Sequence, residues 1–297
     1  MRTVALIGAP SSMGAHAPGQ ERAPRALREA GLAERLRRAG REVTDRGDAA
    51  LRRWAPDREQ RRAQNAAAVA AAAGEVADRV EAALAAGELA LVLGGDCTTE
   101  LGVVAGAQRA GPERVGLVYL DMHPDLNTPE TVPGGTLDWM GVAHLLALPG
   151  TLPELVRLAR LEPADVVLLG ADAEQSRPQE LAAIAEHRIQ VVPMGLVAQD
   201  PEAAARLALG HVAGAERLLV HFDVDVVDFV DQPLSENTGL NIGLPFAAAI
   251  DALAVLCADP RLAALTVTEH NPLHGAEDGS TTAALADGLV RAARAAA

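Results

Sequence analysis

The sequence contains no lysine, so all 26 of its basic side chains are arginines. Aromatic residues make up only 2% of the chain, and acidic residues exceed basic ones to give a net charge of −14. This charge argues against nucleic acid or an anionic membrane as a partner, and it suits a cationic substrate. No apolar run approaches the ~20 residues that span a bilayer, so we expect no transmembrane segment.

Cysteine is also scarce, with only Cys97 and Cys257 present. Cys257 lies in a stretch rich in alanine and leucine, which predicts a buried helix. The N-terminus lacks the basic and then apolar pattern of a secretory signal. We therefore expect a cytoplasmic protein without a disulfide bond.

Short apolar segments alternate with helical stretches along the chain. The 297 residues are 49% hydrophobic, and we expect a single domain over residues 1–297. The apolar segments are nearly unbroken and β-branched, as in strands covered on both faces, which predicts an α/β fold with a mainly parallel, doubly wound sheet. The expected strands cover residues 3–8, 89–93, 115–120, 165–170, 189–192, 217–222 and 262–268, and the expected helices include 24–39, 63–86, 137–148 and 281–296.

Acidic residues gather where the expected strands end. Asp121 and His123 share one face, as do Asp223 and Asp225, because strand side chains alternate. An isolated Asp-x-His at a strand end is more often a capped turn than a pair of metal ligands. If the two strands are neighbours, however, their carboxylates need a counter-charge, which divalent cations supply. The set sufficient for a two-metal site comprises Asp121, His123, Asp125, Asp223, Asp225 and, as a thiolate, Cys97.

Four short motifs follow one another in the sequence: "GGDCTTE" at 94–100, "DMHPDLNTPE" at 121–130, "FDVDVVD" at 222–228 and "TEHNP" at 268–272. In this order they resemble the motifs of the ureohydrolase family, which includes arginases, agmatinases and formiminoglutamases. With the N-terminal segment, the resemblance covers essentially the whole chain. It implies a three-layer α/β/α domain, a binuclear manganese centre and assembly into homo-trimers or hexamers.

The resemblance also implies a mechanism. A metal-bridging hydroxide would attack the central carbon of a guanidinium or amidine group. Glu269 would hydrogen-bond the guanidinium, and Asp125 would carry the hydroxide proton to the departing amine. The implied metal ligands are Asp121 and Asp223 as bridges, Asp125 and Cys97 for one metal, and His123 and Asp225 for the other.

The chain departs from the family pattern at Cys97, where family members usually have histidine. A Cys97 thiolate and four aspartates bring five negative charges against four positive charges from two divalent ions. That excess would raise the pKa of bound water, and the soft sulfur would shift the preference from manganese toward zinc, iron or cobalt. Alternatively, Cys97 is a protonated bystander and one metal is lost or loosely held.

A second departure concerns substrate recognition. Asn127 keeps the position associated with the amino-acid end of the substrate in arginases. The expected serine falls on Gly134, and the expected proton-shuttling histidine falls on Asp138. Asp138 could act as the acid or base instead, or His144 could approach from the following helix. Gln175 falls near the position of an acid that holds the substrate's α-amino group in arginases.

Three functions are compatible with these motifs. We favour a metal-dependent amidinohydrolase that releases urea, or a urea analogue, from a small guanidino or amidine substrate other than arginine, such as N-omega-hydroxyarginine. The second is a deacetylase-like hydrolase with a single zinc, which the complete set of acids and His123 disfavours. The third is a catalytically impaired family member with a binding or regulatory role, and the retention of Glu269 argues against it.

Overall fold

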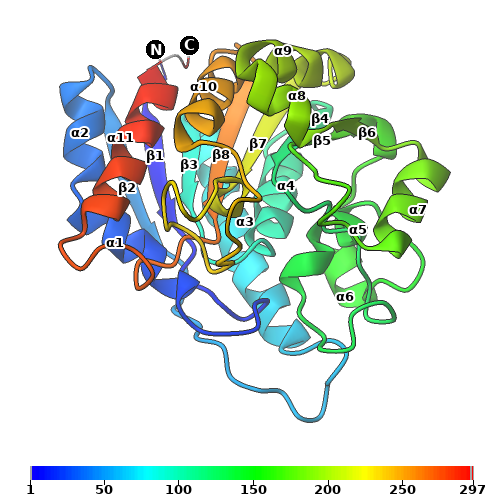
Figure 1. Ribbon diagram of the computed structural model, residues 1–297. Coiled ribbons are helices and arrows are strands. Elements are labelled where there is room, and N and C mark those ends of the chain that lie inside the picture. The colour runs from blue at the N-terminus through cyan, green and yellow to red at the C-terminus, as the bar shows by residue number, and fades with distance from the viewer. Residues whose placement is uncertain (1, 295, 297) are drawn as a thin grey trace.

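The computed structural model describes residues 2–294 and 296, which form an eight-stranded parallel sheet (Figure 1). The strand order is β2-β1-β3-β8-β7-β4-β5-β6, and every neighbouring pair is parallel. The predicted α/β class with a parallel sheet is therefore confirmed. The strands are β1 (Val4–Gly8), β2 (Val43–Asp48), β3 (Leu89–Leu93), β4 (Val115–Leu120), β5 (Val166–Leu169), β6 (Gln190–Val192), β7 (Arg217–Asp223) and β8 (Leu262–Thr268).

Helices cover both faces of the sheet and complete three layers (Figure 1). One apolar core, which contains Phe222, lies between the sheet and α1, α2, α8, α9, α10 and α11. The other core, which contains Tyr119, lies between the sheet and α3 to α7. The helices are α1 (Ala23–Glu29), α2 (Leu32–Arg38), α3 (Ala66–Ala85), α4 (Thr99–Arg109), α5 (Gly141–Leu145), α6 (Pro153–Val156), α7 (Pro178–His187), α8 (Met194–Gln199), α9 (Pro201–His211), α10 (Phe246–Cys257) and α11 (Ser280–Arg294).

The edge strand β2 is missing from the predicted strands. Its sequence, VTDRGD, is polar, and most of its side chains are exposed. Because β2 pairs only with β1, its outer edge faces away from the sheet and needs no apolar run. The periodicity that reveals buried strands is therefore absent.

Three predicted helices differ from the observed ones. The helix expected over 24–39 breaks into α1 and α2 at Gly31, which has a φ of 75°. The helix expected over 137–148 is a single 3-10 turn, η2 (Asp138–Met140), followed by the short α5. The helix expected over 281–296 corresponds to α11 as far as Arg294, and residue 295 lies outside the described residues. In the described part of the chain, no helix is long and apolar enough to cross a membrane.

Helix α4 packs against α3 at very short range. A Cβ atom added at Gly102 would lie 2.5 Å from the carbonyl oxygen of Ala73, and one added at Gly106 would lie 2.6 Å from that of Ala77. Only glycine allows this approach at either position. The contact fixes the start of α4, which directly follows Cys97 and Thr98.

Candidate active site

The polar strand ends converge because β3, β8, β7 and β4 are consecutive in the sheet. Cys97 follows β3, Glu269 follows β8, Asp223 ends β7 and Asp121 follows β4. Carboxyl ends of parallel strands lie at one edge of a sheet, which is where open α/β folds bind ligands. The structure thus brings together side chains that are up to 172 residues apart in sequence.

Cys97 lies at the centre of a buried polar cluster. Its thiol donates a hydrogen bond to Asp223 Oδ2 at 2.9 Å, and its backbone N–H donates to Glu269 Oε1 at 3.0 Å. The sulfur also lies 3.3 Å from Thr268 Oγ1 and 3.5 Å from His221 Nε2. Burial, reinforced by the charges of Asp223 and Glu269, raises the pKa of the Cys97 thiol well above its usual range. Without a nearby cation, Cys97 therefore remains a thiol.

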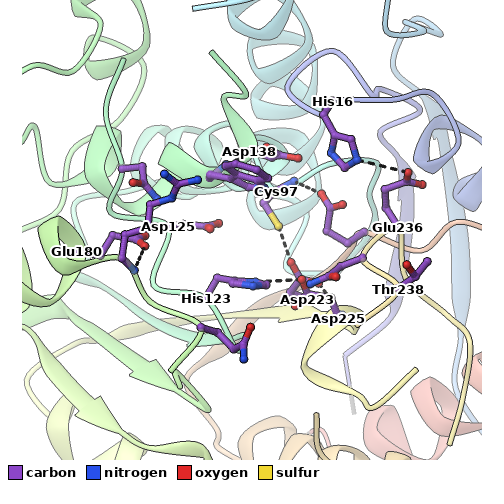
Figure 2. A pocket seen from close by; sticks show the side chains of 16 residues that line it. His16, Cys97, His123, Asp125, Asp138, Glu180, Asp223, Asp225, Glu236 and Thr238 are labelled. Carbon is purple, nitrogen blue, oxygen red and sulfur yellow. Dashed lines mark hydrogen bonds and ion pairs between the residues drawn. The ribbon is translucent and has the colours of Figure 1, made fainter. Parts of the chain in front are cut away.

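The neighbouring cluster is centred on His123. Its Nδ1 atom lies 3.1 Å from Asp225 Oδ2 and 3.5 Å from Asp121 Oδ1. Burial opposes the charge of His123, but Asp225 and Asp121 outweigh it and raise the pKa of the imidazole well above its usual value. The imidazole of His123 points toward these carboxylates (Figure 2), and its raised pKa favours the charged form that would balance them.

Two carboxylate oxygens of this cluster have no hydrogen-bond partner among residues 2–294 and 296. They are the buried atoms Asp121 Oδ2 and Asp225 Oδ1. Burial, followed by the charge of Asp225, raises the pKa of Asp121 to about 6. Unpaired buried carboxylate oxygens are costly, and divalent cations satisfy them.

The potential ligand atoms form two groups, and within each group all atoms lie within 4.8 Å of one another. Asp121 belongs to both groups, as expected for a carboxylate that bridges two metals. The donor types and the unpaired oxygens fit a pair of divalent cations. The groups are Cys97, Asp121, His221 and Asp223, and Asp121, His123 and Asp225.

Asp125, predicted as a further ligand, falls outside both groups. Its Oδ2 atom accepts a hydrogen bond of 2.6 Å from the Tyr119 hydroxyl. Its backbone has a φ of 50°, in the left-handed region that aspartate tolerates better than most residues. Burial and then the charge of Asp121 raise the pKa of Asp125 well above its usual range. Its carboxyl group faces the same pocket as Cys97 and His123 (Figure 2).

Glu269 is held in a strained loop at the end of β8. Its φ is 62°, an uncommon conformation for a glutamate. Its carboxylate accepts hydrogen bonds from the Cys97 backbone N–H and from Gln20 Nε2, both at 3.0 Å. Burial, with the charge of Asp96, raises the pKa of Glu269 well above its usual range. A cationic group in the pocket would restore its ionised form.

These residues open into a pocket of about 350 Å³. Acidic side chains occupy its inner part, whereas Arg177, whose guanidinium lies 5.6 Å from the centre of the Trp139 ring, brings a positive charge. The size is typical of a small-molecule site. The lining side chains are His16, Cys97, His123, Asp125, Asn127, Asp138, Trp139, Gln175, Arg177, Glu180, Asp223, Asp225, Glu236, Asn237, Thr238 and Glu269 (Figure 2).

Of the two residues considered as replacements for the missing shuttle histidine, only Asp138 reaches the pocket. Asp138 lines the pocket, and burial together with Glu269 raises the pKa of its carboxyl well above its usual range. His144 does not line the pocket. Its Nδ1 lies 2.7 Å from the Met140 carbonyl oxygen, and its Nε2 accepts from the Leu152 backbone N–H at 3.1 Å. His144 is therefore a buried structural histidine.

The remaining predicted residues have different placements. Asn127 and Gln175 line the pocket, whereas Gly134 does not. Cys257 is buried in α10, where burial raises the pKa of its thiol to about 12. The prediction that Cys257 belongs to the core is confirmed.

Sequence reasoning missed His221 as a member of the cluster. It sits within the apolar run of β7, which suggests a core position, and it is completely buried. The available signal was its position two residues before Asp223, because side chains two apart in a strand share a face. Tyr119, two residues before Asp121, was missed for the same reason.

The chain is similar to known proteins over nearly its whole length. A profile described as the Arginase family matches residues 2–294. Arginase-1 of Homo sapiens is 29% identical over 290 residues, which cover 92% of this chain and 86% of that protein. The native arginase structure from Bacillus caldovelox has a TM-score of 0.84 at 26% identity and covers 99% of this chain and 98% of its own. A formiminoglutamase from Trypanosoma cruzi shares the fold, with a TM-score of 0.77 at 19% identity over 100% of this chain and 95% of its own.

Proposed function

Because the chain belongs to the arginase family, we propose that it is a metal-dependent amidinohydrolase acting on a small guanidino or amidine substrate. The products would be an amine and either urea or a urea analogue. The observation that carries the proposal is Asp121, whose carboxylate belongs to both groups of potential metal ligands beside the pocket. A single-metal, deacetylase-like site would not need such a shared carboxylate.

The metals would be held by side chains at the ends of three central strands, β3, β4 and β7. Asp121 and Asp223 would bridge, with Cys97 on one side and His123 and Asp225 on the other. Divalent cations bound there lower the pKa of water and so supply a hydroxide nucleophile near neutral pH. Manganese is expected from the family, and the sulfur of Cys97 favours zinc, iron or cobalt.

Glu269 would bind the guanidinium of the substrate. Its carboxylate borders the pocket, and its two hydrogen bonds, from Cys97 N–H and Gln20 Nε2, fix its orientation. A charged, oriented carboxylate matches a planar cation with several N–H donors. Glu269 would therefore hold the reacting carbon at a fixed place above the metal-binding acids.

Two further acids would handle protons. Asp125, held by the Tyr119 hydroxyl, would take the proton of the nucleophile and deliver it to the departing amine. Asp138 stands where the family has its shuttle histidine, and burial together with Glu269 raises the pKa of its carboxyl well above its usual range, which suits a proton-carrying role. Both side chains face the pocket (Figure 2).

The outer part of the pocket favours a substrate other than plain arginine. Asn127 is available for the carboxylate end of an amino acid, and Arg177 adds a cation that suits an anionic group. Gly134 and Gln175 remove two of the polar groups associated with arginine recognition. We propose a modified arginine, with the hydroxyguanidine of N-omega-hydroxyarginine as the leading candidate.

One observation favours the alternative of an impaired, regulatory family member. The Cys97 thiol donates a hydrogen bond to Asp223 Oδ2, an oxygen that a metal would need. We nevertheless favour catalysis, because Glu269, Asp125 and Asp138 all face the pocket and a purely regulatory protein has no need of them.

We further propose a cytoplasmic homo-trimer or homo-hexamer, on the basis of the family resemblance. Light scattering coupled to size-exclusion chromatography would measure the assembly directly. A monomer at micromolar concentration would contradict this part of the proposal.

The decisive experiment combines elemental analysis with an activity panel. The purified protein, loaded separately with manganese, zinc, iron(II) and cobalt, is incubated with arginine, N-omega-hydroxyarginine, agmatine, guanidinobutyrate and formiminoglutamate. Urea, hydroxyurea or the corresponding amide is then quantified by mass spectrometry. We expect two bound metals and turnover of at least one substrate, and no product from any of them with metal bound would overturn the hydrolase proposal.

A further inference from the structure

His221 occupies an unusual place for a core residue. It is fully buried on β7, directly below the pocket, with its Nε2 atom 3.5 Å from Cys97 Sγ and 3.1 Å from Thr268 Oγ1. Its other ring nitrogen, Nδ1, lies 3.1 Å from Glu100 Oε2. A chain of contacts thus runs from Glu100 through the imidazole to the thiol.

This arrangement determines which nitrogen is free to bind. Because a carboxylate oxygen accepts hydrogen bonds, the contact with Glu100 favours the tautomer in which Nδ1 carries the hydrogen and donates it, and this tautomer leaves a lone pair on Nε2. The Tyr119 ring stacks on the imidazole at 4.0 Å, with the planes 7° apart, and fixes its orientation. Metal-binding histidines are typically oriented in this way, with one nitrogen bound to a carboxylate and the other to the metal.

We propose that His221 is a nitrogen ligand of the metal that binds beside Cys97, with Glu100 as the carboxylate that positions it. The inference rests on the metal centre proposed above. A ring nitrogen of His221 belongs to the group in which Cys97 Sγ and oxygens of Asp121 and Asp223 all lie within 4.8 Å of one another, and Nε2 is the nitrogen that faces Cys97 Sγ. A histidine from β7 thereby replaces the imidazole that is lost at position 97.

The spacing of the two softest donors supports this assignment. Sulfur and nitrogen bound to one zinc ion at ordinary bond lengths and a tetrahedral angle lie about 3.6 Å apart. Cys97 Sγ and His221 Nε2 are 3.5 Å apart. The imidazole therefore needs little movement to join the thiolate on one metal.

The consequence is that the two metal positions differ chemically. One offers a sulfur, an imidazole nitrogen and two carboxylates, a set that favours zinc or cobalt. The other offers His123 with the carboxylates of Asp121 and Asp225, a harder set that is open to manganese. The structure thus favours a mixed-metal centre over two identical ions.

A purely structural His221 makes different predictions. In that case its replacement would weaken the fold without changing the metal at Cys97. The matched control is His144→Asn, since His144 is equally buried and bonded through both nitrogens but belongs to neither group of potential metal ligands. Both variants lose one buried imidazole, and only His221→Asn should change metal binding.

The test uses the full-length protein in the His123→Asn background, so that His221 is the imidazole within reach of the Cys97 cluster. The protein is loaded with one equivalent of zinc or cobalt. X-ray absorption of the zinc form should show sulfur and imidazole bound to the same ion, and the cobalt form should show sulfur-to-metal charge transfer. Sulfur coordination without imidazole would overturn the proposal, whether or not the His221 variants fold.

Chelator competition provides the second measurement. We expect His221→Asn and Glu100→Gln to weaken cobalt binding by ~10- to 100-fold, and His144→Asn to leave it unchanged. If folded His221→Asn and the parent protein bind cobalt with equal affinity, His221 is not a metal ligand. That result would leave the proposed metal centre itself standing. Failure of the unmodified protein to bind any metal would instead refute the metal centre itself, and with it the inference.

Discussion

Tyr119 contacts His221 and Asp125 through different parts of one side chain. Its ring stacks on the imidazole at 4.0 Å, and its hydroxyl donates a hydrogen bond of 2.6 Å to Asp125 Oδ2. A single buried residue of β4 therefore orients both the deep histidine and the acid that faces the substrate. Tyr119 belongs to the core between the sheet and α4, so packing in that core helps to fix the orientation of both site residues.

Replacing Asp125 tests the assigned proton carrier. Asp125→Asn keeps an oxygen that can accept from Tyr119, so the fold should persist, but it removes the proton acceptor. We expect kcat to fall by about 10²- to 10⁴-fold with an unchanged circular dichroism spectrum. The control is Asp165→Asn, a buried aspartate paired with Arg114 at the start of β5, away from the pocket. Near-normal turnover in Asp125→Asn would exclude the assignment.

The role of Asp138 can be tested by two substitutions that should reduce activity to different extents. Asp138→Asn removes the carboxyl that would take the place of the family's shuttle histidine, so kcat should fall by ~100-fold or more while KM changes little. Asp138→His introduces the residue usual for the family and should retain more activity than the asparagine variant. If both variants lose activity equally through KM, Asp138 binds the substrate and does not move protons.

Cys97→His tests the sulfur ligand. It replaces an anionic soft donor with a neutral nitrogen, so the bound metal should shift from zinc or cobalt toward manganese. Elemental analysis after dialysis against an equimolar mixture of the metals measures the change. Cys257→Ala, which alters the other buried thiol, should leave the metal content unchanged. An identical metal profile in Cys97→His and the parent protein would refute a Cys97 thiolate ligand.

The turn that carries Cys97 depends on Gly95. A Cβ atom there would lie 1.7 Å from the Ser11 carbonyl oxygen, a backbone atom that cannot move aside easily. Gly95→Ala should therefore destabilise the protein by about 1–3 kcal/mol in urea unfolding and weaken metal binding. Gly74→Ala on α3, where a Cβ meets nothing within 4 Å, should instead stabilise the protein by about 0.5–1 kcal/mol. If Gly95→Ala leaves both the free energy of unfolding and metal binding unchanged, the turn can shift without harm and the prediction is wrong.

The stability of the metal-free protein should depend on pH in an unusual direction. The pKa values of Asp121, Asp125 and Asp223 are raised by burial and by mutual repulsion, to about 6 for Asp121. The folded protein then binds more protons than the unfolded chain, so stability is lost as pH rises through these folded-state pKa values. The raised pKa of His123 acts in the same sense. Asp225, whose pKa is lowered, adds stability that is fully present above the ordinary carboxyl range of about pH 4 and is lost only as pH falls below that range.

Thermal unfolding between pH 5 and pH 8 measures this effect. With chelator present, Tm should fall as pH rises over this interval. Bound divalent metal should raise Tm more at pH 8 than at pH 5, because it replaces the protons of the raised carboxyls. Equal stability of the chelated protein at pH 5 and pH 8 would contradict the expected protonation of the site.

The apolar pattern predicts most of the strands, but it predicts neither their order in the sheet nor the buried polar residues beneath the pocket. β3, β4 and β8 match their predicted bounds because both faces of each are buried. That pattern does not encode the order of the strands. The neighbouring positions of β4 and β7 were therefore expected only from the resemblance to a family. His221 escaped notice because a lone histidine in an apolar run looks like packing until Glu100, on a separate helix, is seen to hold it.

The position of β8 has a consequence for synthesis. It is the last strand along the described chain, yet it lies between β3 and β7 at the middle of the sheet. While the chain leaves the ribosome, the segments that carry Cys97 and Asp223 have no strand to join them. The thiol after β3 therefore joins the carboxylates of β4 and β7 only after β8 has been inserted between them.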